Sequence, residues 1–332
     1  MTRVLFVAIC LIGVLGCGGR PEGVANSALD QSESAIINGR DCAAGECPST
    51  VAILVDADLQ SWLGNQKIKT YLCTGTLIAP DVVLAAAHCF DGAALTGGMG
   101  SATRMDFAIS FQSSLDQLAS MATDQFPTDA IQGAYAVKHP RFSMENFNGF
   151  KGGLSTMWDI GLLFLSHPVQ KIQPAVVITG EEAAQIKAGN KIKISGWGYQ
   201  QAMSNPYQQP PAGSYGLKRC AEAEVNEVGL SEMQIGSDDK SARKCHGDSG
   251  GPTYLNIATP FKDHERVIGI TSHAYDNTDC QKGGIDTRVD AYLDWIDANL
   301  TDGCAQGKRS WCDVPGIIPA SHYEPAPAQP LH

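Results

Sequence analysis

The chain has 332 residues, 43% of them hydrophobic and 18% charged, which is typical of a globular protein with a sizeable core. Its formal net charge of −11 argues against nucleic acid or an anionic lipid surface as the main partner. Eleven cysteines are many for a cytosolic enzyme, and no two of them have the CxxC spacing of zinc and redox sites. We therefore expect disulfides and an oxidising compartment.

The N-terminus predicts export. A short basic start precedes an apolar run over residues 4–15, which is too short to span a bilayer as a helix. The run ends in Val-Leu-Gly-Cys at residues 14–17, which resembles the bacterial lipobox, so residues 1–17 form the expected signal segment and Cys17 the lipidated residue. An ordinary signal peptide cut nearby is the alternative. The expected location is a bacterial cell envelope, or the medium after processing.

Residues 18–35 are small and polar and could not bury a core, so we interpret them as a propeptide or linker. From Ile36 onward, short apolar or alternating runs are separated by turn residues, which predicts an all-β domain. The expected strands are residues 51–55, 71–78, 82–85, 107–111, 160–165, 191–195, 267–271 and 284–289.

One helix is expected near the C-terminus. Helical spacing relates four apolar residues, Val289, Leu293, Ile296 and Leu300. Residues 301–332 are interpreted as an extension with a small Cys304–Cys312 loop and a Pro-rich end that we expect to be disordered.

A glycine-rich segment carries a candidate nucleophile. Residues 245–252 read Cys-His-Gly-Asp-Ser-Gly-Gly-Pro, and the glycines would let the backbone turn tightly and expose the hydroxyl of Ser249. The N–H groups of Gly247 and Ser249 could then bind an oxyanion together. GDSGG alone could be a simple glycine turn, whereas the eight-residue string is far more specific.

Two further segments supply a base and an acid. His88 follows a strand-like run and precedes Cys89, and a Cys73–Cys89 disulfide could fix its loop. Asp159 lies at the start of an apolar strand. Alone, the histidine would be an ordinary surface or core residue and the aspartate a charge at a strand edge.

Together these segments resemble the trypsin/chymotrypsin family of serine proteases. The matching segments are residues 36–39, 85–89, 159–163, 195–198, 245–252, 267–272 and 284–289, and the terminal helix also matches. The likeness covers residues 36–300. It implies two six-stranded antiparallel β-barrels, with the active site in the cleft between them.

The resemblance also implies the roles of the site residues. His88 would accept the proton of Ser249, Asp159 would orient His88, and Ser272 would support Asp159. Substrates would be proteins or peptides, and neither metal nor organic cofactor is needed. The family further implies a precursor that another protease cuts before Ile36, after which the new amino group pairs with Asp248.

The expected disulfides depend on different arguments. Cys73–Cys89 and Cys245–Cys280 follow family positions, whereas Cys304–Cys312 depends on proximity alone. The family counterpart of Cys42 pairs at the position of Cys220, which would leave Cys47 unpaired. A Cys42–Cys47 loop with a free Cys220 is the alternative.

The specificity pocket is the least defined part of the site. In the family its floor lies six residues before the nucleophile, which is Arg243 here, where trypsin has an aspartate. The chain should therefore not be trypsin-like. Arg243, with Lys244, could select acidic side chains, or Asp286 could pair with Arg243 and leave a neutral pocket, or Arg243 could turn to solvent. The remaining expected pocket residues are His246, Ser272, His273, Ala274 and Gly284.

Several loops around the cleft depart from the family. The stretch between Cys220 and Cys245 is shorter, the stretch between His88 and Asp159 is longer, and His273 stands where trypsin usually has tryptophan. Since all triad residues are present, an active endopeptidase is favoured. The alternatives are a catalytically inactive binding protein on the same scaffold, and an esterase.

Overall fold

The structure is a computed structural model that describes residues 36–61, 64–96, 100–115, 126–199, 215–258, 264–276 and 280–323. Four predictions lie outside the described residues, namely the signal segment at 1–17, the lipidated Cys17, the linker at 18–35 and the Pro-rich end at 324–332. Among the residues described, no helix is both long and apolar enough to cross a membrane.

The first half of the chain forms a closed antiparallel barrel. Its strands are β2 (Thr50–Ser61), β3 (Gly64–Ala79), β4 (Val82–Ala85), β5 (Gly100–Ser110), β6 (Ile131–Lys138) and β7 (Gly161–Leu165). They pair in the order β2-β3-β4-β7-β6-β5, and β5 returns to β2. The apolar runs of β4 and β7 are adjacent in this barrel and are buried throughout.

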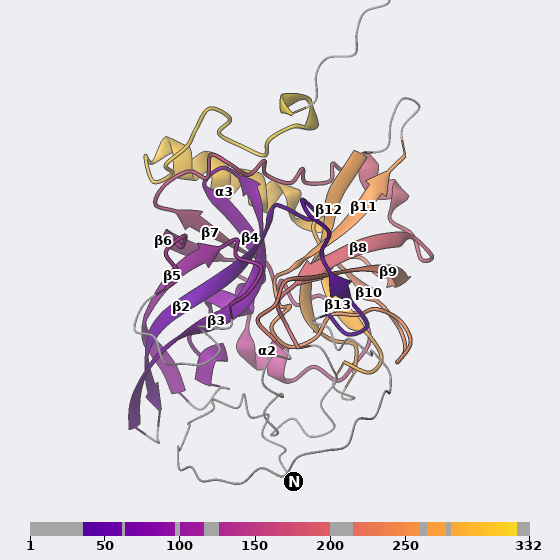
Figure 1. Cartoon of the computed structure of the whole chain (residues 1–332), viewed down its shortest axis with the longest axis horizontal. Coiled ribbons are helices and arrows are strands. Elements are labelled where there is room, and N and C mark those ends of the chain that lie inside the picture. Colours follow the sequence, from indigo (N-terminus) through magenta and orange to yellow (C-terminus); the bar gives the residue numbers. More distant parts are fainter. Residues whose placement is uncertain are drawn as a thin grey trace, which may run out of the picture.

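The second half forms another closed barrel beside the first (Figure 1). Its strands are β8 (Lys191–Gly196), β9 (Arg219–Val228), β10 (Glu232–Ile235), β11 (Pro252–Ile257), β12 (His264–Ala274) and β13 (Gly284–Arg288). They follow the order β9-β10-β13-β12-β11-β8, and β8 also pairs with β9, which closes the ring. The short β1 (Arg40–Asp41) adds to the free edge of β9. The prediction of two six-stranded antiparallel barrels is confirmed.

Helices are few and short. A 3₁₀ turn, η4 (Asp290–Tyr292), leads into α3 (Leu293–Ala305), and the apolar positions Ile296 and Leu300 are fully buried. The predicted C-terminal helix is therefore confirmed, although it runs past residue 300. The remaining helical segments are η1 (Ala87–Phe90), η2 (Ala94–Thr96), α2 (Met144–Asn148), η3 (Glu182–Gln185) and η5 (Ala320–His322).

The residues after α3 pack against the first barrel. The guanidinium of Arg309 is fully buried and donates to both carboxylate oxygens of Asp81, at 2.7 and 3.3 Å. Ile318 is only 3% exposed, and Ser310 Oγ donates to the carbonyl of Leu165. In Figure 1 this segment is the yellow chain above the first barrel. The extension predicted from residue 301 is thus part of the packed fold as far as Tyr323.

Candidate active site

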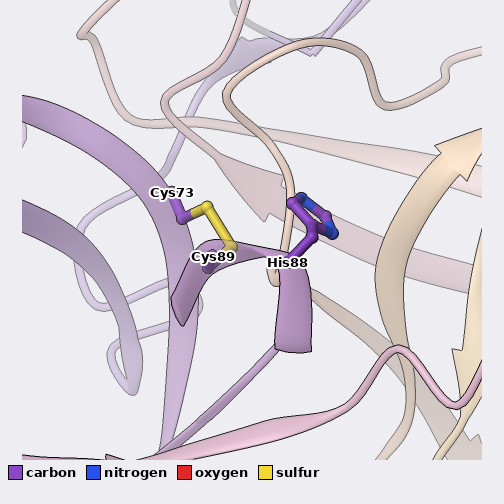
Figure 2. A group of neighbouring side chains, drawn as sticks. All are labelled: Cys73, His88 and Cys89. Atoms are coloured by element: carbon purple, nitrogen blue, oxygen red, sulfur yellow. A yellow bond between two sulfur atoms is a disulfide. The ribbon is translucent and has the colours of Figure 1, made fainter. Parts of the chain in front are cut away.

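A disulfide fixes the segment that carries His88. His88 lies in η1, directly after β4, and the Cys73–Cys89 bond ties this turn to β3. Figure 2 shows the imidazole directed away from the disulfide. The side chain is 14% exposed, so solvent or a ligand can reach one edge of the ring.

The carboxylate of Asp159 orients that ring. Its Oδ2 lies 2.7 Å from His88 Nδ1, while its Oδ1 accepts the backbone N–H of His88 at 2.9 Å. Ser272 Oγ donates to Oδ2 at 2.5 Å. Burial alone would raise the pKa of Asp159, but the adjacent His88 and these hydrogen bonds hold the pKa below its usual value. Since Nδ1 faces the carboxylate, Nε2 is the ring nitrogen that can exchange a proton with another group.

The segment bearing Ser249 packs against the same turn. Its carbonyl accepts the N–H of Thr74 at 2.8 Å, and the sulfur of Cys89 lies 3.8 Å from that oxygen. Gly250 adopts a φ of +78°, and a Cβ there would lie 2.4 Å from the Thr74 carbonyl oxygen. Only glycine allows this close approach. The structure thereby places the backbone of Ser249 directly beside the turn that carries His88.

The glycine turn also carries the two amides expected to bind an oxyanion. Gly247 adopts a φ of +90°, where a side chain would meet Gly198 at 2.8 Å. The N–H of Asp248, between them in sequence, turns back to the carbonyl of Cys245. Within the described chain, the N–H groups of Gly247 and Ser249 have no hydrogen-bond acceptor. An oxyanion could accept both of them.

Sequence reasoning missed two residues that hold this turn. The hydroxyl of Tyr71 donates to the carbonyl of Gly247, and Thr74 Oγ1 donates to the same oxygen at 3.1 Å. The two hydroxyls lie 2.9 Å apart. These bonds fix the Gly247–Asp248 peptide, so this pair of hydroxyls helps to hold the glycine turn. Neither residue has a sequence signal of its own, since both look like ordinary strand residues.

Asp248 is buried behind the turn. Its two carboxylate oxygens accept the N–H groups of Gly198 and Cys245, at 2.9 and 3.0 Å. Burial raises the pKa of Asp248 to about 7 despite these bonds. Ile36 is also fully buried, and Ile37 pairs with Arg243 through two backbone hydrogen bonds of 3.0 and 3.1 Å. The segment that follows residue 35 is therefore already docked against the chain segment leading to Asp248.

Comparison with known proteins agrees with this geometry. Residues 36–296 match the family described as Trypsin. The chain belongs to the trypsin family. It is therefore a member of a family of serine proteases.

The relatives that it resembles include animal proteases. A vitellin-degrading protease of Bombyx mori is 25% identical over 309 residues, which cover 91% of this chain and 96% of the relative. Phenoloxidase-activating enzyme 1 of Spodoptera litura is 28% identical over 256 residues, or 73% of this chain and 64% of the relative. Kallikrein-4 of Homo sapiens is 26% identical over 237 residues, which cover 70% of this chain and 78% of the relative. The bacterial source expected from the lipobox stays a prediction.

In this trypsin-family site, the alternative in which Asp286 pairs with Arg243 does not occur. Asp286 pairs with Lys244, whose Nζ lies 2.8 Å from its Oδ2, and not with Arg243. Thr253 Oγ1 also contacts both groups, and all three side chains are buried. Consecutive residues of an extended segment point to opposite sides, so only one of Arg243 and Lys244 can face Asp286.

Arg243 points the other way and does not reach solvent. It is 3% exposed, its Nη1 donates to the Ser241 carbonyl at 3.1 Å, and its Nε donates to the Cys280 carbonyl. Burial lowers the pKa of Arg243, although Asp239 and Asp238 partly offset this effect. No carboxylate among the described residues lies within salt-bridge distance of its guanidinium. Within the described part of the chain, its guanidinium therefore keeps a positive charge whose hydrogen bonds go to backbone carbonyls.

The other predicted pocket residues differ in exposure and in their contacts. A Cβ on Gly284 would lie 3.6 Å from the His273 carbonyl and 3.7 Å from the Lys244 carbonyl, so Gly284 separates the two chain segments. His246 is exposed, and its ring lies 5.6 Å from that of Tyr199. Ala274 is partly exposed at the end of β12. His273, in contrast, is covered by a loop of the first barrel, as described below.

The structure contains all four expected disulfides and no Cys42–Cys47 loop. They are Cys42–Cys220, Cys73–Cys89, Cys245–Cys280 and Cys304–Cys312. Cys47 is the one free cysteine of the described part of the chain, and burial raises the pKa of its thiol to about 12. Such a thiol stays protonated and unreactive at neutral pH.

Two histidines lie beside pairs of cysteines. The groups are Cys73, His88 and Cys89, and Cys245, His246 and Cys280. In both, the sulfurs form a disulfide and cannot act as thiolate ligands. We therefore assign no metal to either group.

Proposed function

We propose that this chain is a serine endopeptidase with His88, Asp159 and Ser249 as its catalytic triad. The observation that carries the proposal is the hydrogen-bonded line from Ser272 through Asp159 to His88, which ends beside the backbone of Ser249. Ser249 would attack the scissile carbonyl while His88 Nε2 takes its proton. The amides of Gly247 and Ser249 would bind the resulting oxyanion.

The remaining steps follow from proton balance. Protonated His88 gives its proton to the departing amine, which leaves an acyl group on Ser249. A water molecule then attacks the acyl carbon, and His88 takes a proton from this water and returns it to Ser249. Asp159 stays ionised throughout, in keeping with its lowered pKa, and stabilises the imidazolium.

We propose further that the protein is a precursor activated by cleavage before Ile36. Ile36 has a φ of +59°, which is strained for a β-branched residue. The φ torsion of Ile36 includes the carbonyl carbon of residue 35. Cutting the peptide bond between residues 35 and 36 therefore removes this backbone strain. The new ammonium group would give Asp248 a charged partner. Since Ala35 precedes the cut, the activating protease would differ from a trypsin-like enzyme.

The primary specificity is proposed to exclude basic residues. Asp286 neutralises Lys244, whereas Arg243 keeps its charge at the expected pocket floor. A positive charge repels a substrate lysine or arginine and leaves acidic or small polar side chains as substrates. Profiling on a peptide library tests this, and strong cleavage after arginine or lysine would refute it.

The proposed setting is extracellular. Four disulfides are consistent with an oxidising compartment. With Cys17 lipidated, the chain would be held at a membrane until cleavage before Ile36 released the protease domain.

Active-site labelling tests the central proposal. Processed wild-type protein should react with a fluorophosphonate, and Ser249→Ala should abolish the reaction. Because the triad acts as a unit, Ser249→Ala and His88→Ala should each cost nearly as much activity as the double variant. Absence of labelling in correctly processed protein would favour an inactive binding protein instead.

A further inference from the structure

A long loop of the first barrel, residues 139–158, crosses to the second barrel. It connects β6 to β7, and its neck is closed by a 3.0 Å hydrogen bond from the N–H of His139 to the carbonyl of Ile160. The loop contains α2, which lies between the two barrels in Figure 1. Asp159 follows the loop directly, so the loop leaves the fold at the active site.

The far end of this loop is anchored on strand β10. The N–H groups of Ser155 and Met157 donate to the two carboxylate oxygens of Glu232, at 2.6 and 3.1 Å. The hydroxyls of Thr156 and Ser231 lie 2.8 Å apart. Glu232 is only 1% exposed, and hydrogen bonds to a buried carboxylate are among the strong ones. The loop is therefore fixed to the second barrel.

Between these anchors, two aromatic rings enclose His273. The ring of Phe150 lies 4.1 Å from that of His273, and the ring of Phe147 lies 5.7 Å from it on another side. Phe147 also lies 5.1 Å from the ring of His88. The side chain of His273 is consequently only 9% exposed.

The loop also binds the chain just beyond the end of β12. The N–H of Gly153 donates to the carbonyl of Tyr275 at 3.0 Å, and Tyr275 is the first residue after the strand. A Cβ on Gly152 would lie 3.4 Å from the same carbonyl oxygen. The backbone of the loop therefore occupies the space beside Tyr275.

These contacts limit a substrate that lies along the end of β12. The likeness to the trypsin family implies that Ser272, whose hydroxyl contacts Asp159, lines the substrate groove, so we place the substrate residue before the scissile bond, P1, beside Ser272. In an antiparallel arrangement P3 then lies beside Ala274, because both chains advance about 3.4 Å per residue. A fourth residue would lie at Tyr275 and over the side chain of His273. The loop already covers both positions.

We infer that residues 139–158 close the cleft on the N-terminal side of the scissile bond, so that the site accepts no more than about three residues before that bond. The inference rests on the proposed peptidase function and names its substrate class, which is peptides with a short or sharply bent segment ahead of P1. Phe147, Phe150 and Gly153 act as specificity determinants.

The test is a series of acetylated peptide p-nitroanilides of increasing length with one constant P1 residue. For the processed wild-type enzyme, kcat/KM should rise up to three residues and then fall about tenfold for four to six residues, which corresponds to about 1.4 kcal/mol. Phe147→Ala/Phe150→Ala should recover most of this loss on the long substrates. Phe142→Ala is the matched control, because its ring contacts Phe147 at 5.8 Å but stacks on neither histidine.

The outcomes separate this inference from the proposed activity. Equal kcat/KM for three-residue and six-residue substrates would overturn the closure and leave the peptidase function intact. If no peptide is cleaved, the affinity of Ser249→Ala for fluorescent peptides of both lengths decides the matter. Tenfold weaker binding of the longer peptide supports the closure, and equal affinity overturns it. The wild-type length profile alone suffices if the double variant fails to fold.

Discussion

Tyr71 shows how a single hydroxyl can affect the reaction without touching the substrate. It donates to the carbonyl of Gly247 and thereby holds the Gly247–Asp248 peptide, which lies in the chain between the two N–H groups that would bind the oxyanion. We expect Tyr71→Phe to lower kcat by about tenfold, or about 1.4 kcal/mol, with little change in KM. Steady-state kinetics on one peptide substrate measures this.

Tyr254→Phe is the matched control for Tyr71→Phe. Its buried hydroxyl contacts Ser49 and Thr50, at 3.2 and 3.1 Å, away from the glycine turn. This variant should lose about 1 kcal/mol of stability and keep its kcat. Equal kcat for Tyr71→Phe and the wild type would show that Thr74 alone suffices to hold the turn.

Asp248 makes the uncut chain sensitive to pH. Its pKa is raised by burial to about 7, so the folded chain holds a proton that the unfolded chain has already lost above about pH 4. Its contribution to stability is therefore fully present below the unfolded pKa and is lost as pH rises through about 7. Urea unfolding of the uncut Ser249→Ala chain between pH 4 and 8 should show this downward slope.

Two comparisons separate the pH dependence of stability due to Asp248 from that due to other carboxylates. Asp248→Asn should remove it from the uncut chain, whereas Asp159, with its lowered pKa, contributes in the opposite direction. Cleavage before Ile36 should also remove the slope, because an ammonium partner lowers the pKa of Asp248. An unchanged slope in Asp248→Asn would assign the effect to another group.

At the scale of elements, β13 and the segment before the glycine turn are joined by the buried Lys244–Asp286 pair. Removing either partner leaves an unpaired buried charge, so Lys244→Met and Asp286→Leu should each cost about 3–5 kcal/mol. The double variant should cost less than either single change. Denaturant midpoints of the three variants, each in the Ser249→Ala background, measure the coupling; additive losses would argue against a tight pair.

Much of the strand pattern could be predicted from the sequence. The apolar runs at 82–85 and 160–165 became β4 and β7, because a buried strand needs an unbroken apolar stretch. β9 was missed, although its buried Ala221, Ala223 and Val225 alternate with more exposed glutamates. β1 was missed because two polar residues carry no pattern, and it forms only by pairing with β9.

The parts that escaped prediction depend on contacts between distant segments. The choice among the alternatives for Arg243, Lys244 and Asp286 stayed open because sequence spacing does not reveal which of two adjacent side chains faces inward. The loop at 139–158 was noted only for its length, since its anchors Glu232 and Tyr275 are remote in sequence. The triad segments were identifiable because each carries a distinctive local string.

At the scale of the whole molecule, the C-terminal extension links α3 to the first barrel. A chain ending at Gln306 would leave Asp81 buried without Arg309 and would remove the buried Ile318. We expect a loss of about 3–5 kcal/mol from the unpaired charge and about 1.5–3 kcal/mol from the lost apolar contact. Thermal or urea unfolding measures this loss.

The control for that truncation is a chain ending at Tyr323. It keeps every contact described for the extension and should stay within about 0.5 kcal/mol of the full chain. Cys304→Ser in the shorter chain avoids an unpaired thiol, since Cys312 is removed. If the short chain were as stable as the full one, the extension would be dispensable for folding.

The Cys42–Cys220 disulfide sets how far a freed N-terminus can move. Cys42 lies six residues after Ile36, and a segment of that length reaches at most about 20 Å even when fully extended. After cleavage, the new ammonium group would thus stay tethered to β9 at a local concentration in roughly the millimolar range. Its insertion beside Asp248 is intramolecular in any case, because both residues lie in one chain, and the disulfide shortens the tether to six residues. The same bond lies wholly on the protease side of the cut, so it limits the reach of the activating terminus while leaving the leader free to depart.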